Sequence, residues 1–204
     1  MAARARTSHE RREAVEARRA RRAEVTDLDV VMEAAAAFLA VRPRSVKETR
    51  QRLRGLGYPV ALCDGVVDRL IEVGYLDDHA FATAWVESRD RARPRGQLAL
   101  RRELQLKGVP NDTIAAVLDS RDEAPGVAEA RDGGTTAGSA GADVAVARRL
   151  LERRSASLLR ESDPRRLRQH AYALLAGRGF TPDVCAEVSA AFVTQHAEHD
   201  GGAV

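Results

Sequence analysis

Hydrophobic residues recur at intervals of three and four from Val30 onward and keep this spacing along most of the chain. No stretch alternates apolar and polar residues as a half-buried strand does, and β-branched residues are not clustered. The pattern therefore predicts an all-α protein. Glycine and proline interrupt it at regular places, so we expect the helices to be short.

An internal repeat is centred on three glycines, Gly57, Gly108 and Gly179. In each copy a leucine lies four residues before the glycine, a large apolar residue follows it directly, and a valine lies nine residues after it. Such a glycine is typical of a helix end, where the backbone needs a left-handed conformation. A proline two or three residues further on suits the first turn of the next helix. Each copy therefore predicts a helix, a glycine turn and a second helix.

The domain organisation follows from a further helical pattern before each pair, over residues 30–41, 77–91 and 142–154. In the second of these helices, Phe81, Ala84, Trp85 and Ser88 share one face, which we interpret as its core face. The sequence thus predicts three tandem three-helix repeats. The predicted segments are an Arg-rich arm (1–29, disordered or a frayed helix), repeat one (30–76), repeat two (77–118), a Gly/Ser-rich acidic linker (119–141), repeat three (142–193) and a tail (194–204).

Composition narrows the class of protein. Hydrophobic residues make up 44% of the chain, which excludes wholesale disorder. The longest apolar run, Ala34 to Val41, is far too short to span a bilayer, and no signal peptide is recognisable. We interpret Cys63 and Cys185 as buried reduced thiols because both lie inside apolar helical patterns. These features predict a cytoplasmic protein, and without a heptad pattern we expect a monomer.

Positive charge is concentrated in repeats one and two, where residues 42–107 carry 14 basic and nine acidic side chains. Arg50 and Arg101 both lie seven residues before a repeat glycine, so the same helix face is basic twice, whereas Tyr172 takes this position in repeat three. One interpretation is that this face is simply solvated. The other is that it forms a basic stripe that binds phosphates or an acidic protein surface. Under the second interpretation repeats one and two carry most of the binding. The candidate residues are Arg42, Arg44, Lys47, Arg50, Arg54, Arg89, Arg91, Arg93, Arg95, Arg101, Arg102 and Lys107.

The remaining polar motifs predict structure rather than catalysis. Ser45 and Glu48 fit a capping box at a helix start, and Asp77 fits an N-cap. His196 and His199 have no further ligands around them in the sequence, so we expect no metal site. No phosphate-binding glycine loop or nucleophile elbow is present. The sequence therefore predicts a protein without cofactor or active site, and not an enzyme.

Several short motifs together resemble the RecX family of bacterial regulatory proteins. They are Arg42-Pro43-Arg44-Ser45, Leu56-Gly57-Tyr58, Gly74-Tyr75-Leu76-Asp77-Asp78, Phe81-Ala82, Trp85-Val86, Arg89, Gly96 and Glu103-Leu104 with Lys107-Gly108-Val109. The resemblance implies three-helix repeats in an elongated, curved array. It also implies binding in the groove of the RecA filament on single-stranded DNA, inhibition of RecA, and a role in recombination, DNA repair and the SOS response.

Two other classes of protein stay open at this point. Short helices around a glycine turn also fit a helix-turn-helix-like DNA-binding protein, although the residues after each turn are poor in base-reading side chains. A scaffold built as a solenoid is the third possibility. Binding to the RecA filament leaves room for weak, non-specific contact with single- or double-stranded DNA, and none of the three classes requires a membrane.

Overall fold

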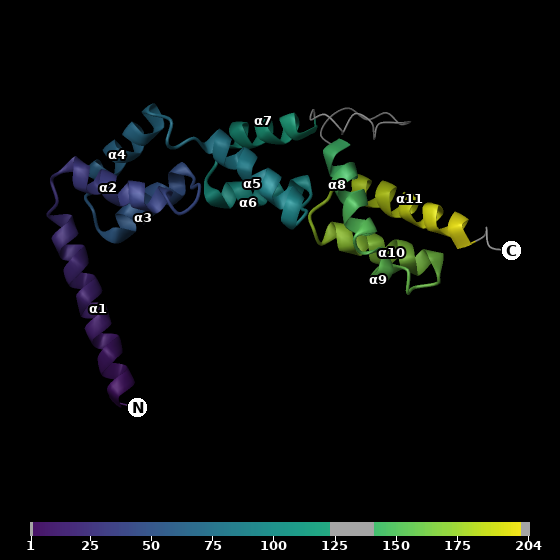
Figure 1. The fold of residues 1–204 in the computed structure, drawn as a ribbon, viewed down its shortest axis with the longest axis horizontal. Coiled ribbons are helices and arrows are strands. Elements are labelled where there is room, and N and C mark those ends of the chain that lie inside the picture. The colour runs from purple at the N-terminus through teal and green to yellow at the C-terminus, as the bar shows by residue number, and fades with distance from the viewer. Residues whose placement is uncertain (1, 123–140, 201–204) are drawn as a thin grey trace. The chain divides into compact units, whose positions relative to one another are not determined.

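The computed structural model describes residues 2–122 and 141–200, which are helical apart from short connections (Figure 1). Because this part of the chain contains no strand, the predicted all-α class is confirmed. None of its helices is both long and apolar enough to cross a membrane. The helices are α1 (Ala2–Ala23), α2 (Leu28–Leu39), α3 (Val46–Leu56), α4 (Val60–Glu72), α5 (Asp78–Ala92), α6 (Gln97–Lys107), α7 (Asn111–Asp122), α8 (Gly141–Glu152), α9 (Ser155–Leu158), α10 (Pro164–Ala176) and α11 (Pro182–Asp200).

The helices group into the three predicted three-helix repeats: α2 to α4, α5 to α7, and α8 with α10 and α11, where α9 is a single turn. Residues 2–23 of the Arg-rich arm form helix α1, the helical one of the two states expected for this segment. Two other segments differ from the expectations. Helix α7 includes residues 119–122 of the predicted linker, and residues 123–140 lie outside the described part. Helix α11 continues through residues 194–200 of the predicted tail.

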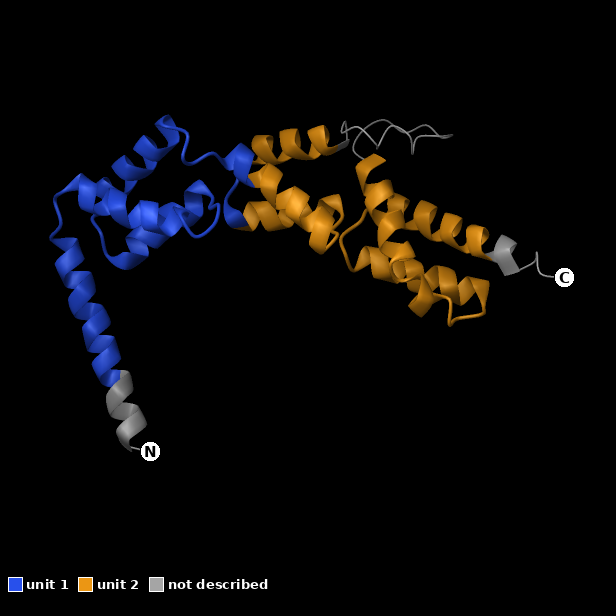
Figure 2. Cartoon of the chain, in the orientation of Figure 1, with its two compact units in different colours: residues 1–81, 107–109 blue, residues 82–106, 110–204 orange. Residues whose placement is uncertain are grey.

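The chain forms two compact units (Figure 2). We call residues 1–81 with 107–109 unit 1, and residues 82–106 with 110–204 unit 2. In unit 1 the core lies among α2, α3 and α4, with Leu53, Cys63 and Val66 completely buried. In unit 2 one core lies among α8, α10 and α11. Both cysteines are buried and free, as predicted.

The glycine turns have the predicted backbone conformation, with φ of 100°, 79° and 80° at Gly57, Gly108 and Gly179. Every apolar position of the repeat is buried. These positions are the leucines before each glycine (Leu53, Leu104, Leu175), the residues after it (Tyr58, Val109, Phe180) and the later valines (Val66, Val117, Val188). The repeat is therefore a packing unit: the chain reverses at glycine, and the residue that follows packs back into the core.

The predicted core face of α5 is wrong in part. Phe81 is buried, but Ala84 and Ser88 are exposed, and the other buried positions are Ala82 and Val86. Trp85 is half-buried and its indole N–H donates to Glu103 at 2.9 Å. A tryptophan with this polar bond sits at the edge of a core, which explains why apolar character alone misplaced the face.

Helix α1 contacts the first glycine turn within unit 1. Arg22 lies over the Tyr58 ring, with 5.5 Å between the guanidinium carbon and the ring centroid. A Cβ added at Gly57 would collide with the Cγ atom of Arg19. The glycine is therefore required here both for its positive φ and for the close approach of α1.

Candidate partner interface

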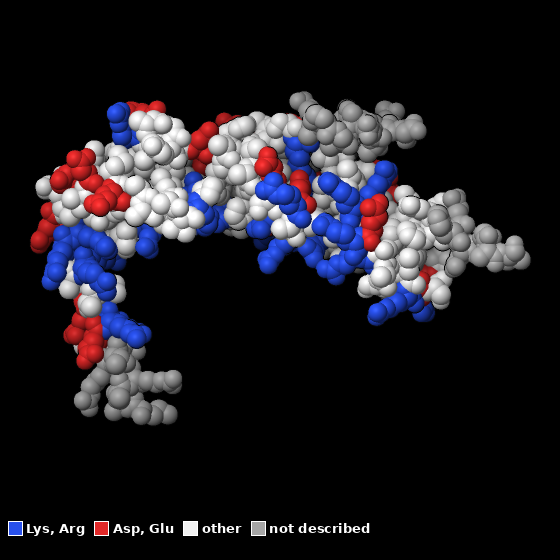
Figure 3. All heavy atoms as spheres, in the orientation of Figure 1, with Lys and Arg blue, Asp and Glu red and all other residues white. Residues whose placement is uncertain are grey.

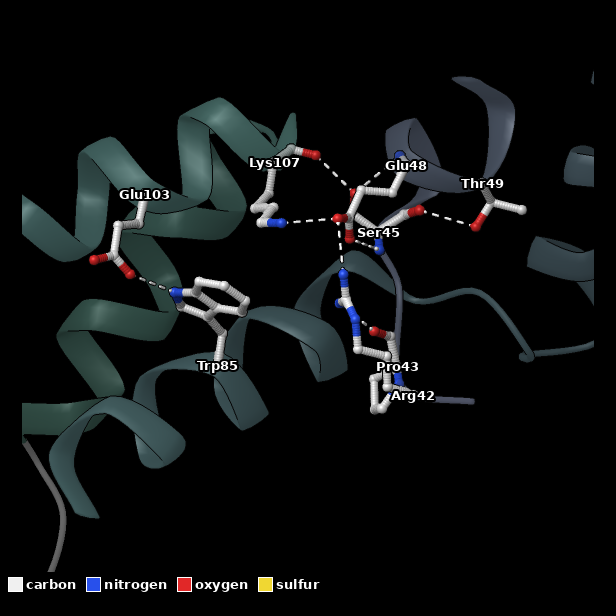
Figure 4. A network of polar contacts seen from close by, with 8 residues as sticks. All are labelled: Arg42, Pro43, Ser45, Glu48, Thr49, Trp85, Glu103 and Lys107. Carbon is white, nitrogen blue, oxygen red and sulfur yellow. Dashed lines mark hydrogen bonds and ion pairs between the residues drawn. The ribbon is translucent and has the colours of Figure 1, made fainter. Parts of the chain in front are cut away.

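The N-terminus of α3 is held by a polar network in unit 1 (Figure 4). Ser45 and Glu48 form the predicted capping box, and the Ser45 hydroxyl also donates to the backbone oxygen of Lys107 at 2.7 Å. The Val46 amide donates to the Asp78 carboxylate at 3.0 Å. Asp77 accepts from the amides of His79 and Ala80, as expected of an N-cap. These bonds join the start of α3 to segments more than 30 residues away in the sequence.

Two candidate cations, Arg42 and Lys107, take part in that network. Both contact Glu48 Oε1, at 3.3 Å and 2.8 Å. Burial raises the pKa of the Glu48 carboxyl, but the bonds from Lys107 and the Ser45 amide, with the charges of Lys107 and Arg42, outweigh burial and lower it below 4.5. Arg42 and Lys107 therefore neutralise a carboxylate of their own unit.

Arg50 and Arg54, at the centre of the predicted stripe, are also paired. The Nε atom of Arg50 lies 3.0 Å from Asp64 and its Nη2 atom 3.9 Å from Asp68. Arg54 Nη2 contacts the same Asp64 carboxylate at 2.9 Å. The stripe on α3 thus faces carboxylates of α4, which reduces the charge it offers to a partner.

Arg44 and Lys47 lie at either side of this helix start. The Arg44 guanidinium stacks over the Phe38 ring at 4.2 Å, and its Nε atom is buried with no hydrogen-bond partner among the described residues. Lys47 is exposed, and its aliphatic stem covers Gly108, which leaves no room for a Cβ there. Both side chains therefore also contribute packing.

In unit 2 the carboxylate of Glu103 gathers two candidate arginines. Arg89 Nε lies 2.7 Å from it and Arg95 Nε 3.5 Å. Arg89 also stacks over the Trp85 ring at 4.3 Å, so this ring is already covered by a cation. Arg91 lies 3.8 Å from Glu87 on its own helix, an exposed pair of little energetic weight.

Three candidates, Arg93, Arg101 and Arg102, make no ion pair within the described residues. Arg93 and Arg102 are exposed and Arg101 is half-buried. Arg50 and Arg101 therefore share a register in the sequence but differ in their surroundings, because only Arg50 faces acidic residues of the following helix.

Repeat three supplies further arginines that sequence reasoning did not include. A hollow of about 700 Å³ in unit 2 brings Arg153, Arg154 and Arg178 together with Arg93 and Arg95. Figure 3 shows basic side chains gathered in this region, where the connection between α5 and α6 lies beside α8 and α10. One signal was available: Arg178 precedes Gly179 as Lys107 precedes Gly108.

The start of α6 in unit 2 is anchored in the way that the start of α3 is anchored in unit 1. The Gln97 amide donates to Asp143 on α8 at 2.8 Å, and the Gly96 amide donates to the Arg178 backbone oxygen at 3.1 Å. Arg121 bonds Asp143 at 2.7 Å and Asp90 at 2.8 Å. Burial lowers the pKa of Arg121, but these two carboxylates raise it above its ordinary value. The second anchor therefore carries an almost completely buried ion pair.

These features define an all-α protein made of tandem three-helix repeats whose helix starts are tied to residues of the next repeat. Models of the RecX family match all three repeats: the first three-helix domain over residues 32–70, the second over 77–118 and the third over 142–188. The chain belongs to the RecX family.

Individual relatives agree with this assignment. Regulatory protein RecX of Mycobacterium avium (strain 104) is 32% identical over 151 residues, covering 74% of this chain and 78% of that protein. Regulatory protein RecX of Mycobacterium tuberculosis (strain ATCC 25177 / H37Ra) is 32% identical over 154 residues, covering 74% and 79%. The crystal structure of RecX from Lactobacillus salivarius shares the fold, with a TM-score of 0.60 at 19% identity over 79% of this chain and 93% of that one.

Proposed function

We propose that this chain is a regulatory protein that binds the filament of RecA on single-stranded DNA, in its helical groove, and inhibits the ATPase and recombinase activity of RecA. The observation that carries the proposal is the match to RecX over all three three-helix domains. Such a protein would modulate recombination, DNA repair and the SOS response. It would itself hydrolyse nothing, so any change in ATP turnover would be a change in RecA.

The charge distribution supports contact with a polyanionic filament. Arg93, Arg101 and Arg102 make no ion pair within the described residues, so their charge is available. Arg50 and Arg54 would first have to leave Asp64. We therefore assign the main electrostatic contacts to α6 and the turn before it rather than to α3.

The direct test is hydrolysis of ATP by RecA of the same organism in the presence of single-stranded DNA, titrated with this protein at two salt concentrations. We expect inhibition that weakens as salt rises, because exposed charges are screened. An excess of the protein over RecA that leaves hydrolysis unchanged would contradict the proposal. A gel shift that detects a preferred duplex sequence would instead favour a DNA-binding protein of the helix-turn-helix kind.

Two double variants test the assignment to α6. Arg101→Gln with Arg102→Gln removes two unpaired charges, and Arg165→Gln with Arg168→Gln removes two exposed charges from α10 as a control. We expect the first pair to weaken inhibition about tenfold, since two exposed ionic contacts of about 0.7 kcal/mol each add up to about 1.4 kcal/mol, and the control to inhibit normally. Equal inhibition by both variants, at unchanged helix content, would refute this role of α6. Arg50→Glu is unsuitable because it would place a carboxylate beside Asp64 and Asp68.

A further inference from the structure

The arginine hollow is the hollow in unit 2 that five arginines line. It lies in unit 2 between the turn before α6, the C-terminal end of α8 and the turn before α11. Its volume, about 700 Å³, is within the range of ordinary ligand sites. Its lining residues are Ala92, Arg93, Pro94, Arg95, Leu150, Arg153, Arg154 and Arg178.

The carboxylates near the hollow balance little of this charge. Of the five lining arginines, only Arg95 has an ion pair within the described residues, at 3.5 Å from Glu103. That carboxylate is shared with Arg89, which lies closer, at 2.7 Å. The Arg95 Nε atom is buried and makes no hydrogen bond in the described structure. Five arginines thus line one hollow, and among the described residues they share a single paired carboxylate, that of Glu103.

The backbone beneath the hollow is held rigidly in place. The Gly96 and Leu98 amides donate to the backbone oxygens of Arg178 and Gly179, each at 3.1 Å. A Cβ at Gly96 would collide with the backbone oxygen of Gly179, so these two turns are in backbone-to-backbone contact. Asp143 ties α8 to the same helix start through the Gln97 amide. The arginines therefore project from a preorganised frame, which lowers the entropy cost of binding.

The chemistry of the lining favours phosphate groups. Guanidinium groups bind phosphate oxygens with two parallel hydrogen bonds, and several of them together match a row of phosphates. The lining contains no aromatic ring on which a base could stack, and no amide, hydroxyl or carboxylate side chain of the kinds that read adenine or cytosine. Its arginines could bind guanine as well as phosphate, so a test with mixed-sequence strands is part of the experiment. The small apolar floor of Ala92, Pro94 and Leu150 offers nothing specific to a base either.

We propose that the arginine hollow binds the sugar–phosphate backbone of a nucleic-acid strand without reading its sequence. A nucleic-acid strand carries one negative charge per nucleotide at regular intervals. It can therefore place several phosphates near the five arginines of the hollow at once. The inference deepens the proposed function and rests on it for its biological sense, because the strand would be the one that RecA holds. It also gives repeat three a binding role, whereas the charge pattern of the sequence alone favours repeats one and two.

The test compares two triple variants of the full chain with equal loss of charge. The hollow variant is Arg153→Gln, Arg154→Gln and Arg178→Gln; the control is Arg160→Gln, Arg165→Gln and Arg168→Gln, all exposed and outside the hollow. Fluorescence anisotropy of a labelled oligomer of about 16 thymidines measures affinity over a range of salt concentrations. Thermal unfolding followed by circular dichroism verifies that both variants fold.

We expect the hollow variant to bind at least about tenfold more weakly at low salt, and the slope of log K against log salt to fall by about 2, as three lost phosphate contacts require. The control should stay within about threefold of the parent protein and keep its slope. A mixed-sequence oligonucleotide should bind as tightly as oligothymidine. Equal losses in both variants, or a strong sequence preference, would overturn the proposal.

Two competitors distinguish a nucleic-acid strand from an acidic protein segment and from a small polyphosphate. Poly-glutamate of matched total charge and inorganic tripolyphosphate should each displace the oligonucleotide far less effectively than unlabelled strand does. If poly-glutamate competes equally, the hollow is a site for an acidic protein segment and the proposal is wrong. If tripolyphosphate binds as tightly as the strand, the ligand is a small polyphosphate and the proposal is equally wrong.

The DNA assay contains no RecA, so the two proposals can fail separately. A parent protein that binds the strand through the hollow but leaves RecA hydrolysis unchanged would refute the proposed function alone. A hollow variant that binds the strand normally would refute the arginine hollow alone, even if the parent protein inhibits RecA.

Discussion

Gly74 and Gly179 have nearly the same backbone conformation, with φ of 76° and 80°, but very different surroundings. A Cβ at Gly74 would meet nothing within 4 Å. At Gly179 it would lie 2.5 Å from the Ala99 Cβ and 2.8 Å from the Ala99 backbone nitrogen, neither of which can move away without shifting α6. One glycine is therefore required only for its φ, and the other also for close contact between segments.

This difference predicts unequal costs of the same substitution. Gly74→Ala should lower the free energy of unfolding by about 1 kcal/mol, the cost of a left-handed non-glycine residue. Gly179→Ala should lower it by at least about 2 kcal/mol more, because overpacking is added to the strain. Urea denaturation of the two variants measures both values. Equal costs would show that the contact with Ala99 relaxes freely.

At the scale of elements, the start of α3 depends on a charged group with a lowered pKa. The bonds of Lys107 and Ser45 and the charges of Lys107 and Arg42 outweigh burial and stabilise the ionised Glu48. The pKa of Glu48 in the folded state is therefore below the unfolded value of 4.5. The ionised carboxylate contributes fully to the free energy of unfolding above pH 4.5, and this contribution is lost as the pH falls through the lowered pKa. The pKa of Asp78 is shifted in the opposite direction, because burial raises it above 3.8.

Glu48→Gln should therefore remove part of the acid sensitivity of the protein. At pH 7 we expect the variant to lose about 1.5–3 kcal/mol of unfolding free energy, the value of a hydrogen bond to a charged group. The difference from the parent protein should shrink between about pH 5 and pH 3. Chemical denaturation at a series of pH values measures this difference.

Glu72→Gln is the matched control for this experiment. Among the residues that the structure describes, Glu72 pairs only with Arg69, one turn away on the exposed surface of α4, so its removal should change little at any pH. If the difference in unfolding free energy between Glu48→Gln and the parent protein stays constant down to about pH 3, the role given to the ionised carboxylate is contradicted.

At the scale of the whole molecule, the repeat leucines lie in separate cores. Leu53 belongs to the core of α2, α3 and α4, and Leu175 to the core of α8, α10 and α11. Both are completely buried at the same register of the repeat. In repeat proteins stability is a sum of repeat and nearest-neighbour terms, so damage to one repeat should stay partly local.

Hydrogen exchange followed by mass spectrometry can test this locality. Leu53→Ala and Leu175→Ala should each cost about 2–5 kcal/mol, the range for a buried leucine. The first variant should lose protection mainly in α2 to α4, and the second mainly in α8, α10 and α11. Uniform loss along the chain in both variants would show that the protein unfolds as one cooperative unit.

The sequence by itself determined the elements and their turns. Helical periodicity, the glycines at 57, 108 and 179 and the Ser45–Glu48 box are properties of neighbouring residues, and local physics decides their conformation. Even there, the face of α5 was misjudged, because alanine is too small and Trp85 too amphipathic to mark a core face. The repeat leucines and valines were buried as predicted, since a fixed register places them on one helix face.

Only the tertiary structure decided which arginines are available. Arg50 and Arg101 are equivalent in the sequence, yet α4 places Asp64 and Asp68 beside Arg50 alone. Arg93 and Arg178 are far apart in the chain and line one hollow. A long charged side chain takes its partner from whatever packing brings within reach, and the energy of that pairing depends on distance and burial. Periodicity therefore predicts where a charge lies on its helix, whereas its partner is set by the packing of segments distant in the sequence.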